Sequence, residues 1–227
     1  MIVGNGLLAR AFAPIYGDNP HITVFASGVS NSRESRPQEF ARECGLLRAA
    51  LGAGRRLLYF STCSIGDPEL LGSAYVQHKL AMEHLVCGGA RDNAVFRLPQ
   101  VVGHTPNPHT LTNFLHHQIA NGLPFHVWRG AWRNLIDVDD VARIVQYLVG
   151  HGLCGPVATT VASPFSVPVT EVVGAFETVL ARKAICDFVD AGGKYGVDAS
   201  VAREVAAKVG ICFDDLYVLN LIRKYYG

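Results

Sequence analysis

Apolar residues along this chain follow two kinds of pattern, which predict short buried strands separated by helices. Continuous apolar runs at residues 1–3, 22–26 and 56–61 are typical of strands buried on both faces of a parallel sheet. After residues 4–6, and again over 74–86, apolar residues recur at intervals of three or four, which indicates helices. We therefore expect an α/β fold with a parallel sheet and helices on both of its faces.

The second half of the chain predicts further helices and short strands after a loop at 104–109. Hydroxyl and acidic residues mark the expected helix starts, and glycines mark the expected ends. The expected elements are a helix over 111–121 ended by Gly122, a strand over 125–128, a turn over 129–133, a helix from Asp139 or Asp140 to Gly150, and helices that open at Thr170 and Ser200.

Tyr75 and Lys79 are the strongest candidates for chemistry in the chain. Within a helix over 74–86 they would lie one turn apart on the same side. A nearby ammonium stabilises phenolate and lowers the pKa of a tyrosine toward working pH, so that it can act as general acid or base. The alternative is a chance pair on a solvated face. The residues expected near one face of this helix are Leu80, Ala81, His84 and Leu85.

Ser61 and Thr62 end the apolar strand that precedes the Tyr75 helix. Open α/β sheets bind ligands at the carboxyl ends of their strands, so these hydroxyls would lie where a substrate and a cofactor bind. The alternative is that they only terminate the strand. The Tyr75–Lys79 pair that follows favours the functional interpretation.

Gly4-Asn5-Gly6 connect the first strand to the first helix, in a Gly-x-Gly-x-x-Ala motif that ends at Ala9. Glycines at such a bend let the backbone approach a pyrophosphate, whose charge the helix amides and dipole stabilise. The motif alone is common at strand–helix turns. Its position ahead of the Thr62 and Tyr75 elements favours dinucleotide binding.

Together these segments resemble the extended short-chain dehydrogenases/reductases of the NAD-dependent epimerase/dehydratase group, which mostly act on nucleotide-linked sugars. The resemblance extends over nearly the whole chain. The segments that carry it are Gly4-Asn5-Gly6-Leu7-Leu8-Ala9, Phe25-Ala26-Ser27-Gly28, Phe60-Ser61-Thr62-Cys63-Ser64-Ile65, Tyr75-x-x-x-Lys79, Phe96-Arg97-Leu98-Pro99-Gln100-Val101-Val102-Gly103 and Arg133-Asn134-Leu135-Ile136-Asp137-Val138-Asp139-Asp140-Val141.

The resemblance implies a role for each matching residue. Tyr75 would be the general acid or base, Thr62 would hydrogen-bond the reacting carbonyl or hydroxyl, and Lys79 would bind the nicotinamide ribose and tune Tyr75. Arg133 would bind a substrate diphosphate with its bidentate guanidinium, unless it is a surface arginine in a polar loop. The further expected cofactor contacts are Gly4, Asn5, Gly6, Leu7, Leu8, Ala26, Ser27, Gly28, Ser61, Leu98 and Pro99, and the further expected substrate contacts are Cys63, Ser64, Gln100 and Asn113.

The chain also departs from the family pattern. Only residues 17–21 connect the first helix to the strand at 22–26, whose Ala26-Ser27-Gly28 ending resembles the family's fourth strand. We therefore expect a reduced sheet that lacks the second and third strands. The acidic residue that normally binds the adenosine ribose ends the second strand, so NAD and NADP both stay open. Arg10 and Arg33 are candidates for a 2′-phosphate, or simply surface arginines.

Composition argues against several other classes of protein. A chain of 227 residues that is 49% hydrophobic can bury a full core without disulfides or a metal. A net charge of +1 gives no electrostatic basis for binding nucleic acid or a membrane surface. The six cysteines have no C-x-x-C spacing, so we expect reduced thiols in a cytoplasmic protein. No apolar stretch reaches membrane-spanning length, and Met1 to Gly4 already fits the fold rather than a signal peptide.

Four histidines in one region raise the question of a metal site. They are His104, His109, His116 and His117. No carboxylate or thiolate completes a ligand set at a recognisable spacing, so we expect polar surface or substrate-loop histidines and no metal.

These observations predict a Rossmann-like dinucleotide-binding core over 1–103, to which 134–150 returns, and a small substrate-binding α/β cap over 104–227. The predicted activity is hydride transfer between NAD or NADP and a sugar carbinol or ketone. Dehydration is disfavoured, since Cys63 and Ser64 stand where a dehydratase has an additional acid. Epimerase and reductase both stay open.

Two other interpretations of the same residues remain. A non-catalytic dinucleotide-binding regulatory module and a degenerate family member are the alternatives to an enzyme. For the assembly, the resemblance implies a homodimer that pairs through helix 74–86 and the helix before strand 56–61.

Overall fold

The computed structural model describes residues 1–90, 92–155 and 157–227, and it divides into two compact units. Unit 1 consists of Met1–Leu98 and Val138–Val161. Unit 2 consists of Pro99–Asp137 and Ala162–Gly227. The division expected from the sequence, into a core and a cap that meet at residue 103, stays a prediction.

Unit 1 is built on a five-stranded parallel sheet with the strand order β1-β2-β3-β4-β8. Its strands are β1 (Ile2–Val3), β2 (Ile22–Phe25), β3 (Arg56–Thr62), β4 (Ala94–Leu98) and β8 (Thr159–Thr160). The first strand lies at an edge of this sheet, whereas a complete dinucleotide-binding sheet places two more strands beyond it. The expected α/β class with a reduced parallel sheet is therefore confirmed.

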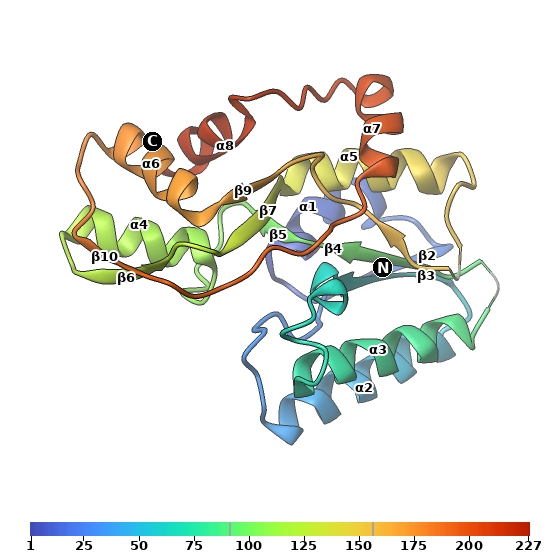
Figure 1. Ribbon diagram of the computed structural model, residues 1–227. Coiled ribbons are helices and arrows are strands. Elements are labelled where there is room, and N and C mark those ends of the chain that lie inside the picture. The colour runs from blue at the N-terminus through green and yellow to red at the C-terminus, as the bar shows by residue number, and fades with distance from the viewer. Residues whose placement is uncertain (91, 156) are drawn as a thin grey trace. The chain divides into compact units, whose positions relative to one another are not determined.

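Helices cover both faces of the unit 1 sheet (Figure 1). On one face lie α1 (Leu7–Tyr16) and α5 (Val138–Gly150), and on the other lie α2 (Pro37–Gly52) and α3 (Ala74–Cys87). Successive side chains of a strand point to opposite faces, so β3 supplies both cores. Phe60 packs on Phe12 of α1 with ring centroids 5.0 Å apart, while Tyr59 belongs to the core beneath α2 and α3.

The buried face of α3 differs from the one expected from its apolar residues. Ala81 and His84 are exposed, and Leu80 and Leu85 are only partly buried. The residues that α3 buries are Tyr75, Val76, Lys79, Met82, Glu83 and Val86. Hydropathy alone does not indicate this buried face, because two of its side chains are charged and a hydropathy pattern assigns charged side chains to solvent. Each of them has an ionic partner, which makes its burial tolerable.

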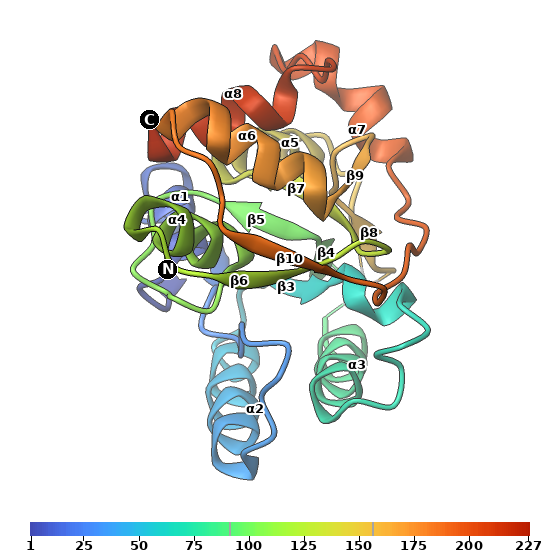
Figure 2. The ribbon, with the colours of Figure 1, turned by 60° about the vertical axis from the view of Figure 1, so that its left-hand side comes forward.

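Unit 2 contains two small sheets and four α-helices in its described residues. Strands β5 (Gln100–Val102), β7 (Trp132–Asp137) and β9 (Ser166–Pro168) form one sheet, in which only β9 runs antiparallel to its neighbour. Strands β6 (Phe125–Trp128) and β10 (Cys186–Val189) run side by side as a parallel pair (Figure 2). The helices are α4 (Leu111–Asn121), α6 (Val169–Leu180), α7 (Ser200–Val205) and α8 (Tyr217–Tyr226).

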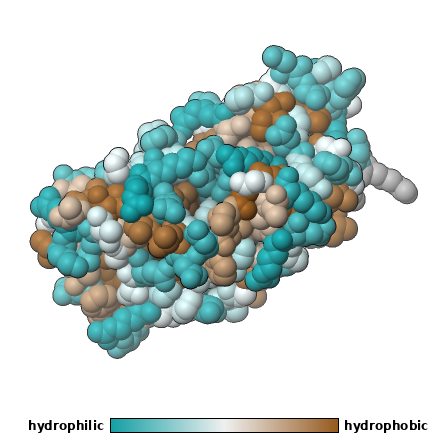
Figure 3. Space-filling model, turned by 90° about the horizontal axis from the view of Figure 1, so that it is seen from above, coloured by the Kyte–Doolittle hydropathy of each residue, from teal (hydrophilic) through white to brown (hydrophobic). Residues whose placement is uncertain are grey.

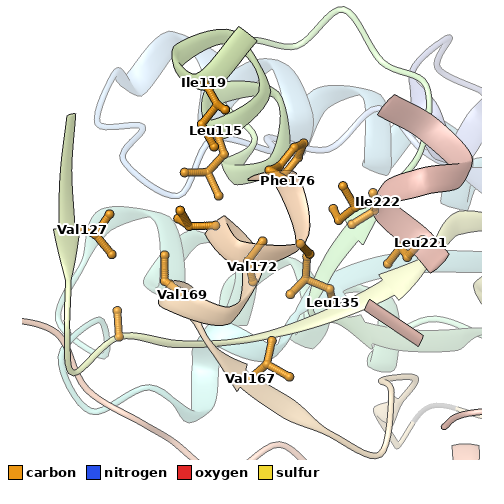
Figure 4. Close-up of a cluster of buried hydrophobic side chains, with 14 of the residues drawn as sticks. Leu115, Ile119, Val127, Leu135, Val167, Val169, Val172, Phe176, Leu221 and Ile222 are labelled. Atoms are coloured by element: carbon orange, nitrogen blue, oxygen red, sulfur yellow. The ribbon is translucent and has the colours of Figure 1, made fainter. Parts of the chain in front are cut away.

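A separate hydrophobic core holds unit 2 together (Figure 4). Side chains from α4, α6 and α8 meet those of β6 and β7, and Phe176 and Ile222 are fully buried among them. Asp137 fixes the end of α8, because its carboxylate accepts hydrogen bonds from Lys224 Nζ at 2.7 Å and from the Tyr225 hydroxyl at 2.6 Å. The last helix therefore contributes to the core of unit 2 and is hydrogen-bonded to the end of β7. The sequence patterns did not indicate these contacts.

Some elements differ from those expected. β7 begins at Trp132, so Arg133 lies in a strand and not in the expected turn. The helix expected to open at Ser200 and to end before Gly210 is divided into α7 and a 3-10 turn over Ala206–Val209. Strands β8 and β9 have two and three residues, too few for any periodicity to show, and they form only because a distant strand offers hydrogen bonds.

The surface mixes hydrophobic and hydrophilic residues, and on the side seen in Figure 3 brown patches lie among teal ones. Large apolar side chains that are partly exposed include Trp128 and Phe188 of the β6–β10 pair. Within the described residues, no helix is both long enough and apolar enough to cross a membrane.

Candidate functional site

The turn between β1 and α1 has the features of an anion-binding loop. Gly4 has φ +121°, and a Cβ there would lie 2.5 Å from the carbonyl oxygen of Ala26, so only glycine fits. Gly6 is the N-cap of α1, no side chain caps that helix end, and a Cβ on Gly6 would meet nothing within 4 Å. The first amides of α1 are therefore open to an anion, as a pyrophosphate requires.

The end of β2 lies against this turn. The backbone N–H of Ala26 donates to the carbonyl of Val3 at 2.8 Å, which brings residues 26–28 beside Gly4. Ser27 accepts two hydrogen bonds of 3.2 Å from the Arg42 guanidinium, one on its carbonyl and one on its hydroxyl. The expected cofactor contacts from β1, α1 and β2 thus lie at one edge of the unit 1 sheet.

The end of β3 presents the two expected hydroxyls. Thr62 caps the 3-10 turn Cys63–Gly66, because its Oγ1 accepts the N–H of Ser64 at 3.1 Å. This leaves the hydroxyl proton of Thr62 available to a ligand oxygen. The Oγ of Ser61 is buried and has no hydrogen-bond partner among the described residues. A buried hydroxyl without a partner is costly, so this atom suits a ligand group.

Tyr75 lies in the first turn of α3, which Ser73 caps by accepting the N–H of Val76 at 3.2 Å. The Tyr75 ring is buried in a small apolar cluster with Val29, which follows β2, and Ile65, which follows β3. The start of α3 therefore meets the carboxyl ends of both strands. This packing brings Tyr75 to the region of Thr62 and Gly28.

The Lys79 side chain is buried and makes more hydrogen bonds within the protein than expected. Its side chain is 3% exposed, and its Nζ donates to Glu43 Oε1 at 3.0 Å and to the Tyr59 hydroxyl at 3.2 Å. The other oxygen of Glu43 accepts the Val29 N–H at 2.6 Å and lies 3.0 Å from His78 Nε2. The Tyr59 hydroxyl also donates to Glu43 Oε1 at 2.7 Å. We call Glu43, Tyr59, His78 and Lys79 the Glu43 cluster.

Burial and charge act in opposite directions on this cluster. Burial alone would raise the pKa of Glu43, but the hydrogen bond from His78 and the charge of Lys79, with the Val29 N–H and the Tyr59 hydroxyl, lower it to about 2. Burial lowers the pKa of Lys79, and the charge of Glu43 opposes that effect. Burial also raises the pKa of Tyr59 well above its usual value, and the adjacent Glu43 charge adds to this rise. The cluster is thus an ion pair with a neutral phenol.

Glu43, Tyr59 and His78 were not among the expected site residues. Glu43 recurs at helical spacing with Phe40, Leu47 and Ala50, a pattern that could have indicated a carboxylate on the buried face of its helix. That was the one signal in the sequence that pointed to Glu43. A buried carboxylate needs donors, but sequence spacing within α2 does not identify donors on β3 and α3.

The expected substrate residues of unit 2 lie on three of its elements. Gln100 is on β5, and its Oε1 is buried without a hydrogen-bond partner among the described residues. Asn113 is held within the unit, since its amide donates to two carbonyls at 2.8 Å and its oxygen accepts the Tyr226 hydroxyl at 2.6 Å. The Arg133 guanidinium is partly exposed and donates to the Trp132 carbonyl at 2.7 Å.

Within the described part of the chain, no group of three or more His, Cys, Asp or Glu side chains could hold a metal ion. Two of the four histidines in the 104–117 region contact aromatic rings. His104 meets the edge of Tyr225 with centroids 5.0 Å apart, and His116 lies 5.1 Å from Tyr226.

Comparison with family models identifies this chain. Residues 20–157 match the model described as NAD dependent epimerase/dehydratase family. The match extends from β2 to the segment before β8 and includes Thr62, Tyr75 and Lys79. The chain therefore belongs to the NAD dependent epimerase/dehydratase family. No curated protein sequence matches it significantly.

Several solved structures share the fold. The UDP-glucose 4-epimerase of Thermus thermophilus in complex with NAD is 18% identical, with a TM-score of 0.71 over 96% of this chain and 80% of that chain. A dTDP-4-dehydrorhamnose reductase of Clostridium acetobutylicum is 12% identical, with a TM-score of 0.75 over 99% of this chain and 96% of that chain. The protein RMD of Pseudomonas aeruginosa, complexed with NADPH, is 18% identical, with a TM-score of 0.68 over 93% of this chain and 82% of that chain.

Proposed function

We propose that this protein is an NAD- or NADP-dependent epimerase or reductase that acts on a carbinol or ketone of a nucleotide-linked sugar. The observation that carries the proposal is the start of α3, where Tyr75 and Lys79 are both buried beside the carboxyl ends of β2 and β3. Family membership supports the use of a nicotinamide cofactor. Two further similar structures, which contain UDP-glucose or UDP-glucuronic acid, support a nucleotide sugar as the substrate class.

The residues of unit 1 fit a dinucleotide. The open amides of α1 suit its pyrophosphate, and the partnerless Ser61 Oγ suits a hydroxyl or amide group of the cofactor. Lys79 donates two of its three N–H groups within the protein, so the third is available to a ribose hydroxyl. When bound, a nicotinamide supplies a hydride acceptor or donor next to the substrate.

The protein's own residues would handle the proton. In the oxidative direction, Tyr75 as phenolate takes the proton of the substrate hydroxyl while the carbon gives up a hydride, and a carbonyl forms. In the reductive direction, the Tyr75 hydroxyl returns that proton to the carbonyl oxygen. The Thr62 hydroxyl donates a hydrogen bond to the same oxygen and holds it in line.

In this proposal the expected contacts keep their roles. Cofactor contacts come from Gly4, Asn5, Gly6, Leu7, Leu8, Ala26, Ser27, Gly28, Ser61, Leu98 and Pro99. Cys63, Ser64, Gln100 and Asn113 bind the sugar nucleotide, and Arg133 binds its diphosphate. The proposed substrate is a small molecule, and the proposal includes neither nucleic acid nor a membrane as a partner. A homodimer that pairs through α2 and α3 completes the proposal, and sedimentation equilibrium tests it.

A Tyr75→Phe substitution tests the chemistry. We expect kcat to fall by roughly 10²–10⁴-fold, because the general acid or base is lost, with little change in cofactor affinity. Turnover is measured on UDP- and dTDP-sugars with NAD(H) and NADP(H). Tyr147→Phe is the matched control, since the ring of Tyr147 in α5 stacks on His151, just after that helix, and keeps its packing without the hydroxyl. Equal turnover in Tyr75→Phe and the wild type would contradict the proposal.

A binding experiment separates the enzyme from the degenerate alternative. The mass of any nucleotide that co-purifies, followed by calorimetric titration of NAD(H) and NADP(H), gives the cofactor and its preference. We expect saturable binding of one of the two pairs. Absence of binding to either would rule out the cofactor role of unit 1.

A further inference from the structure

Glu43 is buried beside the lysine on which the proposed chemistry depends, yet no step of that chemistry uses it. It is 0% exposed and comes from α2, while Lys79 comes from α3 and Tyr59 from β3. An isolated carboxylate at such a position would be very unfavourable, so its four donors determine its state. The carboxylate on α2 therefore meets side chains from α3 and β3.

The hydrogen bonds of the Glu43 cluster fix the position of the Glu43 carboxylate. The two oxygens of Glu43 face four donors: the Val29 N–H, the Tyr59 hydroxyl, His78 Nε2 and Lys79 Nζ. This set uses the acceptor capacity of a carboxylate, so Glu43 has no site left for a ligand. Lys79, in contrast, donates to two acceptors among the described residues, which leaves one N–H. The carboxylate is the fixed end of the cluster, and the ammonium is the end that can meet a ligand.

Gly28 closes the cluster on the side of β2. A Cβ at this position would lie 2.7 Å from Lys79 Nζ and 3.0 Å from Glu43 Oε1. The ion pair therefore lies directly against the backbone of the segment expected to line the cofactor. Any larger residue at position 28 would have to push the ammonium or the carboxylate away.

The other charges that face Lys79 have partners of their own. Glu83, one turn further along α3, binds Arg97 of β4 through two hydrogen bonds of 2.9 and 2.6 Å. Arg42 of α2 pairs with Glu39 at 3.1 Å. Tyr59 and Tyr75 are phenols, and His78 faces the far oxygen of Glu43. Glu43 is thus the anion in direct contact with Lys79 among the described residues.

We propose that Glu43 is a positioning residue, which fixes Lys79 Nζ beneath Gly28 and keeps it an ammonium, so that one N–H remains for a ribose hydroxyl of the cofactor. The cofactor part of this inference rests on the proposed function, whereas the ion-pair part does not. Glu43 touches neither substrate nor cofactor and acts only through Lys79. Without Glu43, burial would be the main influence on the pKa of Lys79, and the ammonium would lose its proton at a lower pH.

Lysine NMR tests the ion pair directly. The chain has only five lysines, so the 13Cε signal of Lys79 can be identified by its loss in Lys79→Arg. We expect Glu43→Gln to lower the midpoint of the Lys79 titration by about 1–3 pH units, since an opposite charge is lost. His78→Gln is the matched control, because it keeps a donor for Glu43 and leaves both charges of the pair, and its midpoint should stay close to that of the wild type. An unchanged midpoint in Glu43→Gln would overturn the proposal.

Cofactor affinity tests the consequence. Above the new midpoint, Glu43→Gln should bind dinucleotide about tenfold or more weakly than the wild type, because one hydrogen bond from a charged group is lost. Below the midpoint, the dinucleotide affinities of Glu43→Gln and the wild type should become equal. A merely structural role of Glu43 would weaken binding equally at every pH, and that result would contradict the proposal. Glu43→Asp keeps the charge and should restore the wild-type pH profile.

The variants also separate the two proposals. A shifted Lys79 midpoint in a protein whose wild type binds no dinucleotide would support the ion pair and refute the proposed cofactor use. If Glu43→Gln does not fold, Gly28→Ala tests the same geometry, since its methyl group displaces Nζ. It should alter the Lys79 titration and weaken dinucleotide binding, and a variant with neither effect would overturn the proposal.

Discussion

At the scale of single residues, the site depends on charged side chains that are buried and paired. Glu43 and Lys79 form one such pair, and Glu83 with Arg97 forms another. Both pairs link α2 or α3 to a neighbouring element, and each would be unfavourable if one partner were removed. The cost of the missing partner, and not the attraction itself, makes these residues sensitive to substitution.

Glu43 should therefore leave a signature in acid stability. Its pKa of about 2 lies below the ordinary value of 4.5, so its contribution is fully present above pH 4.5 and is lost as pH falls toward 2. At pH 7 we expect Glu43→Gln to lower the free energy of unfolding by about 3 kcal/mol, because Lys79 stays buried without its counter-ion. Urea unfolding at a series of pH values measures the gap in free energy of unfolding between wild type and variant. It should narrow below pH 4.5, and a gap that stays constant down to pH 2 would show that Glu43 is not ionised in the folded protein.

At the scale of elements, helix starts decide where functional side chains point. Ser73 caps α3 two residues before Tyr75, and Thr110 caps α4 in the same way, through the N–H of Asn113 at 3.2 Å. α1 differs, because its start has no side-chain cap and its amides are left for a ligand. The starts of α2, α6, α7 and α8 also lack a side-chain cap, so it is the glycine turn ahead of α1 that distinguishes its start.

The two caps form a matched pair of predictions. Ser73→Ala and Thr110→Ala should each lower the free energy of unfolding by about 1 kcal/mol, the usual cost of losing an N-cap. Hydrogen exchange should show faster exchange in the first turn of α3 in the one and of α4 in the other. Ser73→Ala should also lower kcat, since Tyr75 lies in the turn that frays, whereas Thr110→Ala should act on KM, since Asn113 in the frayed turn of α4 is a proposed substrate contact. Equal loss of kcat in both variants would contradict a local effect.

At the scale of the molecule, two separate cores stabilise two units. Leu57 is fully buried in the unit 1 core with Tyr59, and Ile222 is fully buried in the unit 2 core with Phe176. The chain enters each unit twice, so each core is assembled from distant parts of the sequence. Stability is therefore set by two sets of long-range contacts.

Core truncations in each unit test this organisation. Leu57→Ala and Ile222→Ala should each cost about 2–5 kcal/mol, from lost burial and the cavity left behind. Hydrogen exchange mass spectrometry should place the loss of protection in β2, β3 and α2 for Leu57→Ala, and in α6, α8 and β7 for Ile222→Ala. The same pattern of loss in both variants would show that the two cores open together.

Much of unit 1 was predictable because its elements carry local signals. Strand β3 has seven residues with an apolar run, and α3 and α5 have clear starts and ends, so their bounds were expected within one or two residues. Unit 2 was harder, since β5, β9 and β10 are short and are defined by their partners. The hydropathy pattern did not indicate the buried face of α3, because buried Lys79 and Glu83 look like surface residues in it.

The sequence by itself determined the α/β class, the reduced parallel sheet and the family, because these depend on periodicity and on motifs of adjacent residues. It also placed Tyr75 and Lys79 one helical turn apart. Only the tertiary structure decided what surrounds Lys79, because Glu43 and Tyr59 lie 36 and 20 residues away along the chain. Partners at such separations are chosen by packing of helices on a sheet, which no local pattern records.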